Sequence, residues 1–216
     1  IIDASISKGN YIGPLHGLPV AVKDQFYTNG IRTTAGSDIL SDFVPDEDAT
    51  VVSKLKEAGA IIIGKLNMSE FAMGDSFYHP AGIPRNPWDI NRNPGMSSSG
   101  SAVATAAFMC ASSLGEDTGG STRIPAAWTG LVGLRPTWGL VSRYGVIPVC
   151  WSMDIVGPIS RTVEDCAITL QAIAGYDPKD SYSYNGTIPD YRNNLTADIR
   201  GVRVGLVMNK IYDHGV

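Results

Sequence analysis

Two short clusters of serine, threonine and glycine hold the residue types of a nucleophilic site. They occupy residues 95–101 and 115–123, and an apolar segment lies between them. Residues this small let backbone N–H groups approach a bound ligand closely. The dense hydroxyls therefore predict a serine nucleophile, and the glycine-rich backbone predicts a site for negative charge.

The base that such a nucleophile needs is less evident. A serine hydroxyl reacts poorly until a base removes its proton, and histidine is the usual base. His16, His79 and His214 are the only histidines, and none is near the clusters in sequence. Lys23 is a second candidate because it follows an apolar run, and burial would lower the pKa of its amine. Its local sequence alone favours a strand-end lysine that reaches water, so the base remains open at this point.

The composition is that of a globular protein. The chain has 216 residues, of which 44% are hydrophobic and 18% charged, with a formal net charge of -4. Dispersed Lys and Arg argue against direct nucleic-acid binding and against a polybasic membrane patch. No apolar run is long enough to cross a bilayer, and the first residues do not resemble a signal peptide. A homodimer is a candidate assembly.

The cysteines indicate the compartment. Cys110, Cys150 and Cys166 are odd in number and are not closely paired in sequence. This arrangement favours free thiols in a reducing environment over a disulfide framework. We therefore expect a cytoplasmic protein.

Strands and helices that would position the clusters follow from the hydrophobic pattern. Strands are expected at 20–22, 60–64, 111–115 and 202–207, and helices at 48–58, 101–110, 125–128 and 162–174. Strand 60–64 and helix 101–110 are expected to be buried, and residues 176–200 to form a long connection. Ser121 falls at or before the 125–128 helix, where outward-pointing N–H groups could hold an oxyanion. The alternation indicates an α/β fold.

Taken together, these segments resemble the amidase signature family. The matching segments are 17–24, 65–71, 86–88, 97–101, 117–125, 130–137, 142–145 and 157–162. The resemblance covers almost the whole chain in the same order. It implies a central mixed, twisted β-sheet with helices on both faces. It also implies that residues 1–216 form a single but incomplete amidase signature domain. The N-terminal helical segment and the C-terminal portion that are typical of the family would be absent from it.

The resemblance further implies a Ser–Ser–Lys triad that requires no metal or organic cofactor. Ser121 would be the nucleophile, Ser97 the bridging serine after a cis peptide bond, and Lys23 the base. The implied supporting residues are the oxyanion-hole N–H groups of Thr118, Gly119, Gly120 and Ser121, the auxiliary Ser98, and a scaffold pair of Asp117 and Arg123. Glu70 would border the substrate pocket, although a surface or capping carboxylate is nearly as good an interpretation.

Three functions are compatible with this pattern. The leading hypothesis is a free-standing amidase that converts a carboxamide to a carboxylic acid and ammonia or an amine through an acyl-enzyme on Ser121. The alternative is the glutaminase (A) subunit of a tRNA-dependent amidotransferase, because the sequence of residues 65–73 resembles that subgroup. Four departures oppose that alternative: Met96 and Ser99 at usual glycine positions, and Trp138 and Trp151. A third hypothesis, an inactive binding-only relative, is opposed by the presence of all three triad residues.

Overall fold

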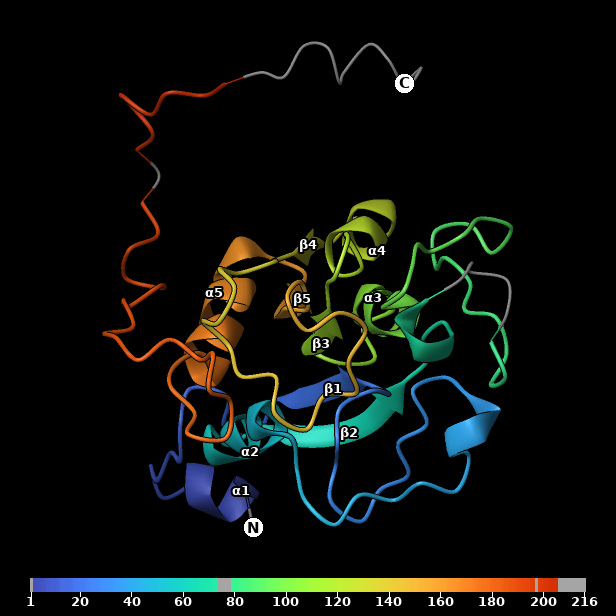
Figure 1. Cartoon of the computed structure of the whole chain (residues 1–216). Helices are drawn as coiled ribbons and strands as arrows, with labels where there is room; N and C mark the ends of the chain where they lie inside the picture. The colour runs from blue at the N-terminus through green and yellow to red at the C-terminus, as the bar shows by residue number, and fades with distance from the viewer. Residues whose placement is uncertain (1, 74–78, 197, 206–216) are drawn as a thin grey trace.

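One mixed β-sheet organises the chain. The computed structural model describes residues 2–73, 79–196 and 198–205. Its strands are β1 (Pro19–Lys23), β2 (Ile61–Leu66), β3 (Ser112–Glu116), β4 (Val132–Gly133) and β5 (Val156–Ser160), in the order β2-β1-β3-β5-β4 (Figure 1). Strand β1 is parallel to β2 and β3, whereas β5 is antiparallel to β3 and β4. The expected mixed sheet is confirmed.

Helices cover both faces of this sheet. The α-helices are α1 (Ile2–Ile6), α2 (Thr50–Glu57), α3 (Ser99–Ala106), α4 (Arg123–Trp128) and α5 (Val163–Ile173), and two 3-10 helices are η1 (Asp38–Leu40) and η2 (Glu70–Ala72). Successive side chains of a strand point to opposite faces. Val20 and Val22 accordingly pack in one cluster with Leu55 of α2 and Leu170 of α5, whereas Ala21 packs against Ala104 of α3. The sheet therefore lies between α2 and α5 on one face and α3 and α4 on the other (Figure 1).

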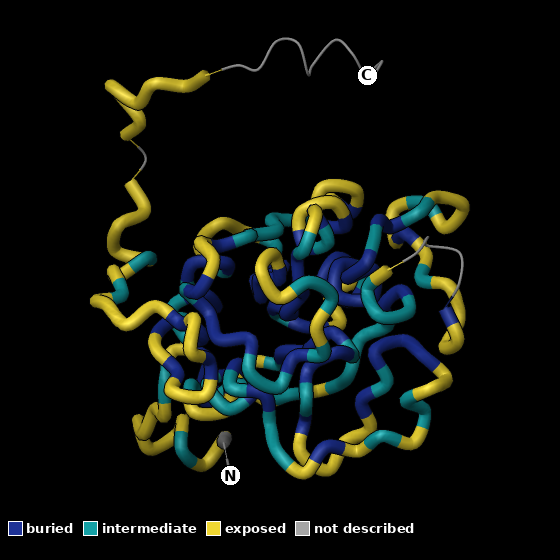
Figure 2. Tube along the Cα trace, in the orientation of Figure 1, coloured by how far each residue is buried: buried dark blue, intermediate teal, exposed yellow. Residues whose placement is uncertain are grey.

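The strand directions bring three strand ends to one edge. Because β1, β2 and β3 are parallel, their carboxyl ends Lys23, Leu66 and Glu116 lie at the same edge of the sheet. The buried residues gather at the centre of the molecule, where β1 and β3 run (Figure 2). The polar residues Lys23 and Glu116, which end the buried strands β1 and β3, therefore lie close together at this edge.

Two expectations about burial are wrong. Strand β2 is present, but Ile61 and Ile63 are 41% and 49% exposed, whereas Ile62, which points to the opposite face of the strand, packs against the core. Helix α3 ends at Ala106, before Phe108 adopts a positive φ of 59°. The following Phe108 and Met109 are 73% and 66% exposed. The apolar composition of these segments predicted neither the exposed face of β2 nor the turn at Phe108.

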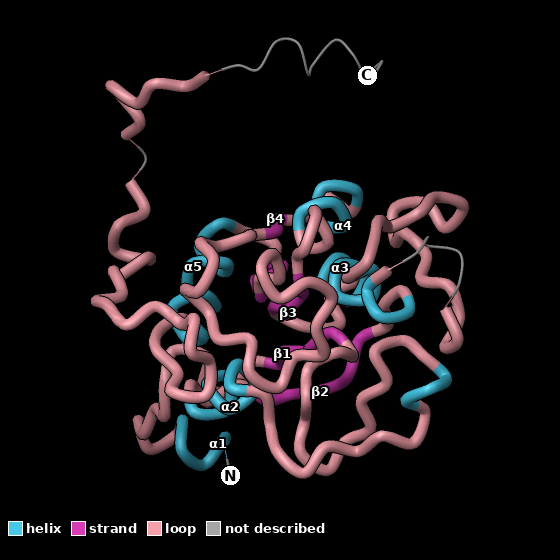
Figure 3. The backbone as a smooth tube through the Cα atoms, viewed as in Figure 1, coloured by secondary structure: helices cyan, strands magenta, loops and turns pink. Residues whose placement is uncertain are grey.

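The segment after α5 has little regular structure. Helix α5 begins as predicted, since the Asp165 N–H donates to Oγ1 of the N-cap Thr162 at 3.0 Å. Residues 176–196 and 198–200 form the expected long connection. Its first part packs on the layered body through the buried Asp177 and Asp180, and its later part runs away from that body (Figure 3). The strand expected at 202–207 is not formed over 202–205, where no neighbouring strand pairs with it, and its remainder lies outside the described residues. No helix in the described ranges has the length and apolar character to span a membrane.

Gly100 controls how closely α3 approaches the end of β2. A methyl group at Gly100 would lie 2.5 Å from both the backbone N and O of Asn67. We expect Gly100→Ala to lower the free energy of unfolding by about 1–3 kcal/mol, because the overpacked backbone must shift. Urea unfolding measures this change. Gly64→Ala is the matched control, since a methyl group there meets no atom within 4 Å, and equal losses for both variants would contradict the prediction.

Candidate active site

The candidate active site lies at the sheet edge where β1 and β3 end. Lys23 is the last residue of β1, and Glu116 is the last residue of β3. Ser97 lies in the loop that leads into α3, and Ser121 lies in the loop between β3 and α4. Residues from distant parts of the chain are thus brought to one edge by the parallel strands.

Lys23 and Ser97 are in direct contact. Lys23 Nζ lies 2.7 Å from Ser97 Oγ, both side chains are fully buried, and the Met96–Ser97 peptide bond is cis. Burial lowers the pKa of Lys23 from its ordinary value to about 8, although the nearby carboxyl group of Glu116 opposes this shift. A substantial fraction of this amine is therefore neutral near physiological pH and able to accept a proton.

Ser98 connects the two hydroxyl clusters. Its backbone N–H donates to the carbonyl of Ser121 at 3.3 Å, and its Oγ lies 3.3 Å from both the N and the O of Glu116. Ser121 itself is half-buried, and its hydroxyl makes no hydrogen bond to any described residue. The expected Ser121–Ser97 hydrogen bond is therefore not formed in this structure. Catalytic hydrogen bonds often tighten only when substrate binds.

The loop before α4 presents backbone donors. The N–H groups of Thr118, Gly119 and Ser121 have no acceptor within the part of the chain that is described. The N–H of Gly120 differs from the expectation, because it donates to Asp117 Oδ1 at 2.8 Å. Asp117 thus accepts one of the N–H groups that were expected to form the oxyanion hole. The other three expected N–H groups remain available to an oxyanion.

Asp117 is the anchor of this loop. The buried carboxylate accepts hydrogen bonds from Arg123 Nε at 3.0 Å and from the Thr122 N–H at 3.2 Å, and Arg135 Nε lies 3.2 Å away. Burial alone would raise the pKa of Asp117, but these donors, led by Arg123, lower it. The Asp117–Arg123 ion pair is present as expected, and Arg135 is a further cation that sequence reasoning missed.

Removing this anchor should destabilise the protein. We expect Asp117→Ala to lower the free energy of unfolding by about 2–3 kcal/mol, because buried backbone donors lose their acceptor. Thermal or urea unfolding measures the loss. Arg123→Ala removes only a half-exposed partner and should cost much less. If the two variants were equally destabilised, Asp117 would not be the anchor of the loop.

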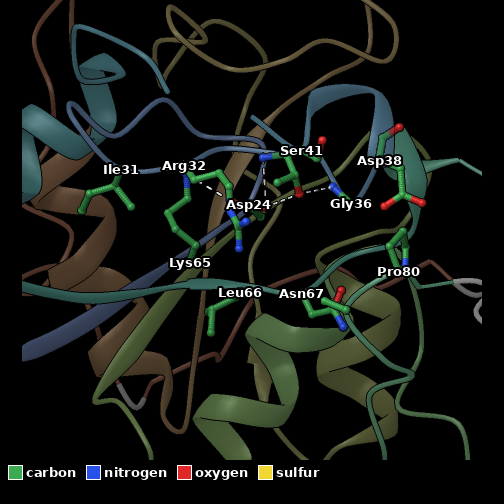
Figure 4. A pocket seen from close by; sticks show the side chains of 13 residues that line it. Asp24, Ile31, Arg32, Gly36, Asp38, Ser41, Lys65, Leu66, Asn67 and Pro80 are labelled. Carbon is green, nitrogen blue, oxygen red and sulfur yellow. Dashed lines mark hydrogen bonds and ion pairs between the residues drawn. The ribbon is translucent and has the colours of Figure 1, made fainter. Parts of the chain in front are cut away.

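A separate cavity of about 540 Å³ opens at the ends of β1 and β2 (Figure 4). Its polar lining includes Asp24 and Lys65, whose Oδ1 and Nζ are 3.4 Å apart, and burial lowers the pKa of Lys65 to about 8. Lys23, Ser97 and Ser121 are not among its lining residues. Glu70 does not line this cavity either. It accepts a 2.7 Å hydrogen bond from the hydroxyl of Ser37, and Ser37 is a lining residue.

The two described histidines make hydrogen bonds to backbone groups outside the serine clusters. His16 Nδ1 accepts the N–H of Ile12, and His79 Nδ1 lies 2.9 Å from the carbonyl of Met68. His214 lies outside the described residues. The three cysteines are free thiols. Among the described residues, Lys23 is the titratable group whose side chain is hydrogen-bonded to a cluster serine.

Besides Arg135, sequence reasoning missed two charged residues of this region, Lys65 and Glu116. Each is one of the last two residues of its strand. Each is also the only charged residue in a strand that is otherwise apolar or made of small residues. The available signal was the position itself, since strand ends at one sheet edge meet in space.

Comparisons with known proteins place these features in a family. The model of the amidase family matches residues 1–215. The chain is 53% identical to the A subunit of glutamyl-tRNA(Gln) amidotransferase from Trichodesmium erythraeum, over 98% of this chain and 44% of that protein. The crystal structure of the same subunit from Thermotoga maritima is 50% identical with a TM-score of 0.78, over 82% of this chain and 39% of that one.

A peptide amidase is a second kind of structural neighbour. The enzyme from Stenotrophomonas maltophilia is 42% identical with a TM-score of 0.79, over 91% of this chain and 39% of that one. The chain therefore spans less than half the length of these relatives.

Proposed function

The chain belongs to the amidase family, and from this premise we propose that it carries the catalytic core of an amidase that cleaves carboxamide C–N bonds. The observation that carries the proposal is the contact between Lys23 Nζ and Ser97 Oγ, 2.7 Å apart and fully buried. A neutral amine in that position can act as a base for a serine. Ser121, in the loop tied to Ser98, is the proposed nucleophile.

The proposed reaction moves protons along the two serines. Neutral Lys23 accepts the proton of Ser97, Ser97 accepts that of Ser121, and Ser121 Oγ attacks the amide carbonyl carbon. The C–N bond then breaks, and the proton returns through Ser97 to the leaving nitrogen, which departs as ammonia or an amine. Water, deprotonated by the same route, releases the carboxylic acid from the acyl-enzyme and restores Ser121.

The charge that develops on the carbonyl oxygen needs donors that are already in place. The N–H groups of Thr118, Gly119 and Ser121 are the candidates, because the N–H of Gly120 is engaged by Asp117. Each such donor stabilises a transition state by about 3–4 kcal/mol. The anchored loop thus supports the proposed oxyanion hole.

Covalent labelling tests the nucleophile. A fluorophosphonate should react with the intact protein, and peptide mapping should place the adduct on Ser121. The Ser121→Ala variant should remain unlabelled while unfolding at an unchanged temperature. An adduct on another serine would refute the assignment.

The substrate class has two candidates. A free-standing amidase would hydrolyse simple carboxamides alone, and the peptide amidase at 42% identity supports this possibility. A glutaminase subunit is favoured by the higher identity of 53% to an A subunit of glutamyl-tRNA(Gln) amidotransferase. Assays of the intact protein with glutamine and with a simple carboxamide, with and without partner subunits, distinguish them. Activity on the simple amide alone identifies the free-standing enzyme, whereas partner-dependent glutamine hydrolysis identifies the subunit.

A further inference from the structure

Glu116 carries a buried carboxyl group that the proposed triad does not use. Its side chain is 1% exposed at the end of β3, and Oε2 lies 3.6 Å from Lys23 Nζ. That separation is longer than the ~2.7–2.9 Å of a charge-assisted N–H···O hydrogen bond. Oε2 has no hydrogen-bond partner within the described ranges. The contact with Lys23 therefore lacks the geometry of a close ion pair.

The other oxygen of Glu116 shares a hydroxyl with a second carboxyl group. Thr118 Oγ1 lies 2.8 Å from Glu116 Oε1 and 2.7 Å from Asp154 Oδ1. Both separations are hydrogen-bond lengths, but a threonine hydroxyl has only one proton to donate. Satisfying both contacts requires a second proton, which one of the two carboxyl groups must carry.

Asp154 is the better site for the negative charge. Its two oxygens receive the N–H groups of Val149 and Cys150 at 2.8–2.9 Å. Hydrogen bonds from backbone N–H groups stabilise the ionised form of a carboxylate. Glu116 receives no backbone N–H at either side-chain oxygen among the described residues, so the second proton belongs on Glu116.

The remaining nearby charges do not change this assignment. Asp117, the next residue, is a carboxylate whose charge is compensated by Arg123 and Arg135. Lys23 faces Glu116 from β1, and Asp154 faces it through Thr118. A neutral Glu116 removes a carboxylate that would otherwise stabilise the ammonium form of Lys23 at this buried end of the strands.

We propose that Glu116 is a positioning residue that stays protonated and donates a hydrogen bond to Thr118, so that it does not hold Lys23 in the charged form and the Lys23 amine can act as the base for Ser97. The same hydrogen bond orients Thr118, the first residue of the proposed oxyanion loop. Burial raises the pKa of Glu116, in keeping with the protonated form, although Lys23 and Thr118 oppose that shift. The inference rests on the proposed function for its kinetic test but not for its spectroscopic one.

The kinetic test uses Glu116→Gln in the intact protein. Glutamine is uncharged and can donate an amide N–H to Thr118, as the carboxylic acid does. We expect the acidic limb of the kcat/KM profile against pH to stay in place, because Lys23 faces a neutral group in both proteins. If Glu116 were ionised, its removal would shift that limb to lower pH by roughly one unit or more, and this result would overturn the proposal. Glu164→Gln, which removes an exposed carboxylate, is the matched control.

The spectroscopic test requires no substrate. The infrared difference spectrum of the intact protein minus Glu116→Gln at neutral pH should contain the carbonyl band of a protonated carboxylic acid, with a shift in D2O. The Glu164→Gln difference spectrum should contain a carboxylate band instead. A carboxylate band for Glu116 would overturn the proposal. Absence of amide hydrolysis, in contrast, would count against the proposed function while leaving this result intact.

Discussion

Replacing Ser121 by alanine should remove amide hydrolysis almost completely. We expect a loss in kcat on the order of 10⁴–10⁶-fold, because the acyl-enzyme bond forms on Ser121 Oγ and removal of a nucleophile disables the whole catalytic unit. Ammonia release from a carboxamide or from glutamine, with partner subunits present if required, measures the loss. The fold should be retained, since this half-buried hydroxyl makes no hydrogen bond to any described residue.

The control separates a nucleophile from a residue of general structural importance. Ser7→Ala removes an exposed hydroxyl just after α1 and should leave kcat unchanged. Turnover by Ser121→Ala at the wild-type rate would mean that another group attacks the amide. In that case the loop between β3 and α4 would be a binding element only.

Replacing Lys23 should be nearly as damaging. We expect Lys23→Met to lower kcat by on the order of 10²–10⁴-fold, the usual contribution of a general base. Lys23→Arg should be equally inactive, because a guanidinium group remains charged and cannot accept a proton. Methionine keeps the length and packing of the buried stem, so unfolding measurements can confirm that the variant folds. An active Lys23→Arg variant would exclude Lys23 as the base.

The pH dependence follows from the same residue. Burial lowers the pKa of Lys23 well below its ordinary value, and only the neutral amine is a base. Below this lowered pKa the ammonium form dominates, so kcat/KM should fall about tenfold for each pH unit and should level off above it. A profile of kcat/KM from acidic to alkaline pH measures this limb. Its absence from Lys23→Met, assayed for residual activity, would connect the limb to this amine.

The sequence determined the features that depend on neighbouring residues. The apolar run at 20–22 predicted strand β1, and the capping-box pattern at 162–165 predicted the start of α5. The order of motifs along the chain predicted the family, and the family model matches residues 1–215. Local propensity and motif order are properties of short segments, so they can be read without knowing what packs against them.

Tertiary structure decided the features that depend on distant segments. Ile61 and Ile63 were expected to be buried, but they lie on the exposed face of β2, and only Ile62 between them packs against the core. The N–H of Gly120, expected to serve the oxyanion hole, instead donates to Asp117 Oδ1. The protonation of Glu116 depends on Thr118 and on Asp154, a residue from a different loop. Exposure, donor availability and charge are set by which groups converge in space, and for this chain the parallel strand ends determine that convergence.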